Sequence, residues 1–186
     1  MKKIYIATGY PLGRLFEEND IFLVQGKEET YGLNSYLYST WILSWEYMTL
    51  EEMLKHSDNF GIEEKSIILE SLENLKKLNL IIEIEKDSFK VFYESIKDLT
   101  FNKQGLGIGH NPIGDTNYDF LINFNKDIRV DLFKYAIWCE GNLDKSIKEV
   151  IESISNDFKI SCYDNLDNWV KSILFLYESK LIILKG

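Results

Sequence analysis

The chain has 186 residues, enough for one large domain or for two small domains of about 90 residues each. Its net charge is −9, from 30 acidic and 21 basic residues, and only two of the basic residues are arginine. A surface of that sign repels the phosphates of nucleic acid. No apolar run approaches the roughly 18 residues of a membrane span, and the apolar stretch at residues 4–8 is too short for a signal peptide. Two cysteines are too few for a disulfide scaffold, so we expect a soluble cytoplasmic protein.

The N-terminal segment predicts short strands. Residues 3–8 form an apolar strand that the turn at residues 9–13, Gly-Tyr-Pro-Leu-Gly, is expected to end. Residues 20–24 and 28–33 are predicted to pair as a hairpin, because Gln-Gly-Lys between them is a turn sequence.

Three helices and a two-stranded wing are expected next. Apolar residues at helical spacing predict a first helix over residues 33–47. The Thr-Leu-Glu-Glu sequence at 49–52 is a capping box that begins a short second helix, and residues 63–78 predict a longer third helix. Residues 80–84 and 89–93 are then expected to pair as the wing. This order is typical of a winged helix-turn-helix.

The second half of the chain repeats that order. Helices are predicted over residues 130–138, 143–155 and 165–179, and a closing strand over residues 181–185. The glycines at 105–109 correspond to the turn that opens the first half, and the closing aliphatic strands also correspond.

The repeat defines the predicted fold class. Trp138 is aligned with Trp45 at the end of each first helix, and matched positions lie about 93 to 101 residues apart. We therefore predict an α+β protein of two tandem winged-helix-like modules related by internal duplication, with three helices and small β-hairpins each. The modules are assigned to residues 1–98 and 99–186.

No sequence motif supports catalysis or a bound cofactor. The glycine-rich segment at 105–119 has the length of a phosphate-binding loop, but Asp115 stands where such a loop needs lysine. His110 and His56 have no partner at metal-ligand spacing, so no metal site is predicted. We expect a protein that is not an enzyme. A small-ligand site in 105–119, lined by His110 and Asp115, stays open as an alternative.

A DNA-binding regulator is the other alternative. Residues 1–98 hold 11 basic and 18 acidic side chains, and residues 99–186 hold 10 and 12. Base-reading helices favour basic and amide side chains, whereas both predicted third helices carry acidic residues on their outward faces. The basic residues that could instead line one surface of the first module are Lys2, Lys3, Lys76, Lys77, Lys86 and Lys90.

Part of the first half carries a family pattern. Residues 31–34 read Tyr-Gly-Leu-Asn at the end of a strand, Trp41 lies on the first helix, and the 49–52 capping box and a leucine-rich helix follow. This arrangement resembles the peptide-recognition family typified by the PQQ-synthesis D protein. The resemblance implies a winged-helix-like fold in which a peptide adds as a strand beside the third helix. The partner strand would then lie against residues 28–33, flanked by Ile68, Leu72 and Leu75.

We therefore favour a cytoplasmic adaptor that binds a protein or peptide partner, with strand addition as the binding mode. Tyr36 and Tyr47 fall off the apolar stripe of the first helix and are expected to be exposed. The residues predicted to contact the partner are Glu28, Tyr31, Leu33, Tyr36, Tyr47, Glu70, Glu73 and Lys77.

Overall fold

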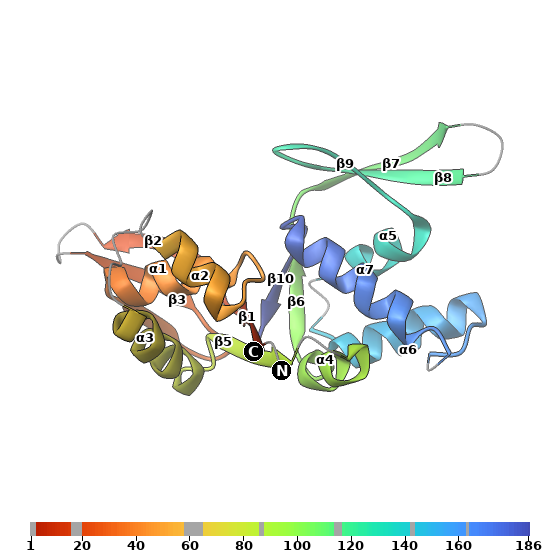
Figure 1. Ribbon diagram of the computed structural model, residues 1–186. Helices are drawn as coiled ribbons and strands as arrows, with labels where there is room; N and C mark the ends of the chain where they lie inside the picture. The colour runs from red at the N-terminus through yellow and green to blue at the C-terminus, as the bar shows by residue number, and fades with distance from the viewer. Residues whose placement is uncertain are drawn as a thin grey trace. The chain divides into compact units, whose positions relative to one another are not determined.

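The computed structural model describes residues 3–15, 20–57, 65–85, 88–113, 117–141, 144–162 and 164–186, with the backbone alone for residues 109–113 and 117–119. Within these residues the chain forms an α+β structure of seven helices and several small antiparallel sheets (Figure 1). It divides into two compact units, Met1–Ser95 with Leu184–Gly186, and Ile96–Ile183.

The first unit begins with strands and continues with helices. Its elements are β1 (Lys3–Ala7), β2 (Tyr10–Leu15), β3 (Ile21–Gln25), β4 (Thr30–Leu33), α1 (Ser35–Ser44), α2 (Leu50–His56), α3 (Lys65–Lys77), β5 (Ile81–Glu85) and α4 (Phe89–Ile96). Strands β2, β3 and β4 form an antiparallel sheet in that order, and β1 pairs with β5.

The second unit repeats the order of the first. Its elements are β6 (Thr100–Lys103), β7 (Leu106–Ile113), β8 (Asn117–Phe124), β9 (Lys126–Val130), α5 (Leu132–Cys139), α6 (Ile147–Phe158) and α7 (Leu166–Glu178). The first two residues of β10 (Ile182–Lys185) also belong to this unit, and its last two belong to the first unit. Strands β7, β8 and β9 form the three-stranded sheet, and β6 pairs with β10.

The same glycine conformation begins the three-stranded sheet in both units. Gly9 has φ +92° and Gly105 has φ +86°, a region that side chains with a Cβ rarely adopt. A Cβ at either position would also lie 2.6 Å from a carbonyl oxygen, that of Gln25 or of Asn123. Each turn therefore requires glycine for its conformation and for its close approach to the central strand.

The first helix of each unit contributes the same aromatic cluster. Tyr38 stacks on Phe22 of β3 with ring centroids 4.2 Å apart, and Tyr135 stacks on Phe120 of β8 at 4.3 Å. A tryptophan one turn later on each helix donates its indole N–H to a carbonyl oxygen just before the repeated glycine. These bonds join Trp41 to Thr8 at 2.9 Å and Trp138 to Gln104 at 2.8 Å.

These contacts correct one sequence alignment. Trp138 corresponds to Trp41, not to Trp45 as the sequence predicted, because Trp41 makes the matching carbonyl bond and tyrosine contact. Trp41 and Trp45 lie four residues apart on one side of the helix, so sequence spacing alone does not distinguish them.

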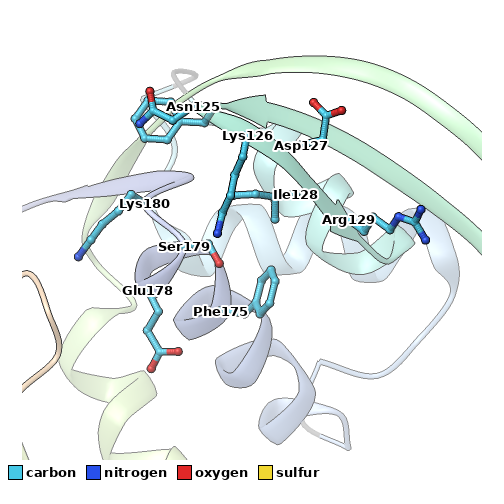
Figure 2. A pocket seen from close by; sticks show the side chains of 10 residues that line it. Asn125, Lys126, Asp127, Ile128, Arg129, Phe175, Glu178, Ser179 and Lys180 are labelled. Carbon is cyan, nitrogen blue, oxygen red and sulfur yellow. The ribbon is translucent and has the colours of Figure 1, made fainter.

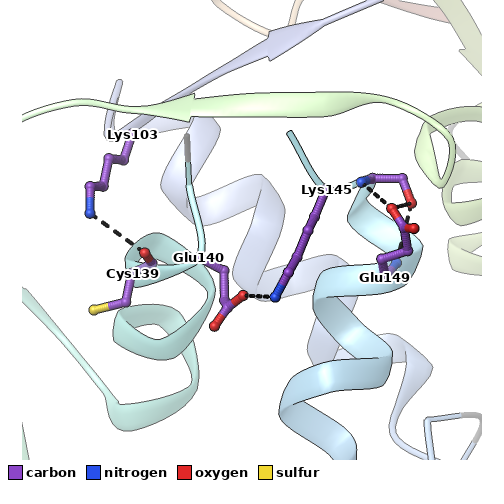
Figure 3. A network of polar contacts seen from close by, with 6 residues as sticks. Lys103, Cys139, Glu140, Lys145 and Glu149 are labelled. Atoms are coloured by element: carbon purple, nitrogen blue, oxygen red, sulfur yellow. Dashed lines mark hydrogen bonds and ion pairs between the residues drawn. The ribbon is translucent and has the colours of Figure 1, made fainter. Parts of the chain in front are cut away.

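Capping boxes begin the second helix of each unit. Thr49 accepts from the Glu52 N–H while the Glu52 carboxylate accepts from the Thr49 N–H at 2.8 Å, which confirms the prediction from 49–52. Ser146 and Glu149 form the corresponding box before α6. Figure 3 shows this second box beside the ion pair of Lys145 with Glu140.

The predicted wing is wrong. Strand β5 pairs with β1, and the residues expected to form the second wing strand belong to the helix α4. Phe92 and Ile96 lie four residues apart on that helix and are both buried, so helical spacing outweighs the apparent strand pattern.

The predicted turns at Gly9–Gly13 and at 105–119 also form strands. Residues 10–13 belong to β2 and residues 106–113 to β7, while residues 117–119 begin β8 and residues 114–116 lie outside the described residues. Strands β2 and β7 each have a register shift, between Pro11 and Gly13 in one unit and between Gly107 and Gly109 in the other. A bulge of this kind accommodates glycine inside a strand, which explains why a glycine-rich segment does not end the sheet. The remaining helices and the hairpin of β3 with β4 confirm the sequence predictions within a few residues.

Candidate functional site

A groove lies beside the outer strand of the sheet in the second unit. The sheet order makes β9 an outer strand, and an open hollow of about 710 Å³ separates it from the C-terminal end of α7. Figure 2 shows the side chains around this groove. Its lining residues are Phe124, Asn125, Lys126, Asp127, Ile128, Arg129, Phe175, Glu178, Ser179 and Lys180.

The turn between β8 and β9 determines which side chains of β9 face the groove. Asn125 takes a left-handed conformation with φ +61°, which asparagine tolerates, and it reverses the chain between Phe124 and Lys126. Side chains then alternate along β9. Lys126 and Ile128 point toward α7 in Figure 2, whereas Asp127 points to the other face of the sheet.

The floor of the groove is apolar. Phe124, Ile128 and Phe175 are all half-buried, so part of each side chain remains available to a partner. The outer strand offers backbone hydrogen-bonding groups, and the half-buried apolar side chains beside it offer a surface that excludes water.

The rim of the groove is mainly cationic. Three cationic side chains, Lys126, Arg129 and Lys180, and two carboxylates, those of Asp127 and Glu178, line it. Because side chains alternate along β9, Arg129 and Asp127 lie on the other face of the sheet, so that Lys126, Lys180 and Glu178 remain beside α7. The Asp127 carboxylate accepts a hydrogen bond of 2.7 Å from the Asn123 side chain.

The end of α7 is capped by its own chain. The carbonyl oxygens of Phe175, Leu176 and Tyr177 accept from backbone N–H groups of the three residues that follow the helix, at 2.8 to 2.9 Å. The lysines on the rim are therefore not needed to satisfy these carbonyl groups.

The first unit has a smaller groove at the corresponding place. It has a volume of about 200 Å³ and lies between the turn that leads into β4 and the C-terminal end of α3. Its lining residues are Lys27, Glu28, Tyr31, Leu78, Asn79 and Gly186. Both units thus combine an outer strand, the end of the third helix and a hollow between them.

The structure separates the residues that the sequence predicted as partner contacts. Glu28 and Tyr31 line the groove of the first unit. Leu33 is only 1% exposed, and it packs in the core because its position on β4 faces α1 and α3. Tyr36 is 46% exposed, but Tyr47 is half-buried and has an edge contact with Phe92 at 6.3 Å between ring centroids.

Residues on α3 also divide into two groups. Glu70, Glu73 and Lys77 are exposed on its outer face. By contrast, the three residues that the family resemblance placed beside the partner are at most 1% exposed and form the core of the unit, namely Ile68, Leu72 and Leu75. They do not flank an added strand. At the end of α3, Leu78 and Asn79 line the groove of the first unit instead.

The groove of the second unit was not predicted from the sequence. The sequence analysis assigned no element to residues 124–129 and began the first helix of the second half at Val130, so β9 was missed. One signal was present, since asparagine separates two runs whose apolar residues alternate, at Ile122, Phe124, Ile128 and Val130.

The basic cluster proposed for DNA is partly neutralised. Lys3 and Lys76 both form ion pairs with Glu83, at 2.5 and 3.0 Å between nitrogen and oxygen. Burial alone would raise the pKa of Glu83, but the hydrogen bonds from the two lysines outweigh it and hold the pKa below its ordinary value. Lys2 and Lys86 lie outside the described residues.

The alternative ligand site falls mostly outside the described side chains. His110 lies on β7 and Asp119 on β8, with only the backbone described, and Asp115 lies outside the described residues. Across the part of the chain whose side chains are described, no three histidine, cysteine or acidic residues gather as a metal site.

Comparisons with family models, with curated proteins and with solved structures gave no match. No helix within the described ranges is both long and apolar enough to cross a membrane.

Proposed function

We propose that this protein is a non-enzymatic adaptor that binds an extended segment of a protein or peptide by adding it as a strand to an outer strand of its sheets. In this proposal each unit is a winged-helix-like module, and the two modules arose by internal duplication. The observation that carries the proposal is the groove between an outer strand and the end of the third helix, which is present in both units.

Strand addition is favoured because an outer strand offers unpaired backbone groups. Alternate N–H and C=O groups of β4 and β9 point away from the neighbouring strand of the same sheet. A partner strand would satisfy them, and the hollow beside each strand leaves room for its side chains. Affinity then comes from the main chain and selectivity comes from the groove.

Nucleic acid is the less favoured partner. The outer face of α3, which would enter a DNA groove, exposes Glu70 and Glu73 beside Lys77. Two lysines of the basic cluster are already paired with Glu83. Carboxylates on a reading helix are repelled by phosphates, so this surface lacks the cationic character of a duplex-binding face.

A peptide-display selection with the full chain tests the proposal. Random dodecapeptides should yield binders, and binding should be measured for each synthetic peptide by fluorescence anisotropy. N-methylation of a backbone amide that bonds to the outer strand should weaken binding about tenfold or more, because it removes a donor and adds a clash.

The critical result is which positions of the peptide are sensitive to N-methylation. In an added strand only every second N–H points toward the protein, so methylating alternate amides should weaken binding while methylating the others should not. Equal effects at all positions, or no peptide binders together with tight binding of duplex DNA, would overturn the proposal.

A further inference from the structure

We infer that the groove between β9 and α7 selects an extended segment in which a carboxylate lies two residues from a bulky apolar side chain. The inference rests on the proposed function, and it names the chemistry of the partner at one of the two grooves. It is carried by the order of side chains along β9 and by the charge of the groove rim.

The first step is the spacing of the side chains that face α7. Lys126 and Ile128 are two residues apart on β9 and point to the same side (Figure 2). In a strand paired with β9, the residues opposite these two positions are also two apart and share that face, at about 4.5–5.5 Å between Cβ atoms. A carboxylate opposite Lys126 would therefore accompany an apolar side chain opposite Ile128.

The apolar member of this pair has a surface to pack against. Phe175 of α7 lies below Ile128 in Figure 2, and Phe124 adds a third half-buried apolar group to the floor. A branched or aromatic side chain entering here would cover all three. A short or polar side chain would leave them in contact with water.

A carboxylate opposite Lys126 is favoured by the charges around the groove. Lys126 is exposed at the mouth of the groove, and no residue that the structure describes forms an ion pair with it. Of the two rim carboxylates, that of Asp127 is turned to the other face and bonded to Asn123, and Figure 2 shows that of Glu178 pointing away from β9. A partner carboxylate would meet Lys126 without an intervening anion.

A second carboxylate is favoured next to the apolar residue. Arg129 follows Ile128 on β9 and lies on the opposite face of the sheet. The partner residue opposite Arg129 is therefore adjacent to the apolar one. The preferred pattern in the partner is acidic, any residue, apolar, acidic, read in whichever direction the added strand runs.

The groove of the first unit lacks this pattern. Its rim offers one lysine and one glutamate, Lys27 and Glu28, and its strand presents Tyr31 where β9 presents Ile128. We therefore assign the selectivity for carboxylates to the second unit alone.

The experiment uses two labelled dodecapeptides, four repeats of Glu-Thr-Val and four repeats of the reverse order, Val-Thr-Glu, which present the pattern in the two directions. Matched probes carry lysine in place of glutamate. With the full chain we expect at least one acidic probe to bind about tenfold or more tightly than its lysine counterpart, in fluorescence anisotropy at low salt.

Charge reversal in each groove locates the site. Lys126→Glu should remove or invert the preference for the acidic probe, whereas Lys27→Glu in the other groove should leave it within about twofold. Both lysines are exposed, so the far-UV circular dichroism of both variants should match that of the wild type. An equal response to the two substitutions would overturn the assignment to the second unit.

Failure of the inference and failure of strand addition are distinguishable. If display-selected peptides bind with alternating methylation sensitivity but show no preference for acidic residues, strand addition stands and the selectivity is refuted. If neither the repeat peptides nor display-selected peptides bind, both are refuted.

Discussion

Replacing two buried tryptophans of the second unit by phenylalanine should separate the contribution of one hydrogen bond from that of ring burial. Trp138 and Trp169 are 4% and 1% exposed. The Trp138 indole N–H donates to the Gln104 carbonyl oxygen at 2.8 Å, whereas the Trp169 N–H has no acceptor among the described residues. The same substitution therefore removes similar ring area from both sites but breaks a bond at only one.

The difference in cost follows from the orphaned carbonyl group. Trp138→Phe leaves the Gln104 oxygen without its indole donor, which costs about 1–3 kcal/mol beyond the lost ring. Trp169→Phe removes a buried N–H that has no partner among the described residues, and this offsets part of its packing loss. We therefore expect Trp138→Phe to destabilise the protein by about 1–2 kcal/mol more than Trp169→Phe.

Urea unfolding of the full chain, followed by far-UV circular dichroism, measures this difference. With a slope of roughly 1–3 kcal/mol per molar urea, the two midpoints of the affected transition should differ by about 0.3–2 M. In thermal unfolding the separation should be about 4–15 °C for a unit of this size. A cost for Trp169→Phe equal to or above that for Trp138→Phe would refute the reasoning.

Further substitutions probe the backbone turns, the caps and the half-buried Glu83 carboxylate. Gly9→Ala should lower the melting temperature more than Gly13→Ala, because both have positive φ but only at Gly9 would the new Cβ lie 2.6 Å from a carbonyl oxygen. Thr49→Ala and Ser146→Ala should each cost about 1 kcal/mol in urea unfolding, and an effect of one without the other would argue against equivalent caps. Glu83 has a lowered pKa when folded, so it stabilises the folded state above its ordinary pKa of 4.5 and loses this contribution as the pH falls through the folded value. Glu83→Gln should therefore cost about 0.5–1 kcal/mol at pH 7 and flatten the acid side of the stability profile; unchanged pH dependence would contradict the assignment.

Local signals in the sequence were sufficient for six of the seven helices within the described residues and for the cap at Thr49. The capping box at Thr49 depends on residues three apart, and its hydrogen bonds form as expected. The hairpin of β3 with β4 is also local, because its turn sequence joins strands that pair directly.

Long-range pairing was not available from these signals. Strand β5 pairs with β1 from the other end of the unit, in a register that joins Lys3 to Glu85. A local interpretation instead paired β5 with the next apolar segment, which is the helix α4. Burial of Phe92 and Ile96 on one side of that helix decides its conformation, and burial depends on the fold of the whole unit.

The candidate site was only partly predictable for a related reason. Glu28 and Tyr31 were predicted from their place in the hairpin, and they line the smaller groove. Ile128 and Phe175 are 47 positions apart in the sequence and meet in one groove only because β9 and the end of α7 come together in the folded unit. Neither residue stands out alone.

The comparison of the two units indicates where a difference in function would reside. The glycine turns, the stacked tyrosines and the tryptophan bonds to a carbonyl group recur in both, so these features are explained by the requirements of one fold. The grooves share their position but differ in volume, about 200 against 710 Å³, and in the charge of their rims. Since the fold is common to the two units, this difference is not needed to build either of them. Selection for distinct partners would act on such positions. Comparing the Lys126→Glu and Lys27→Glu variants is the most direct test of whether the two grooves differ in function.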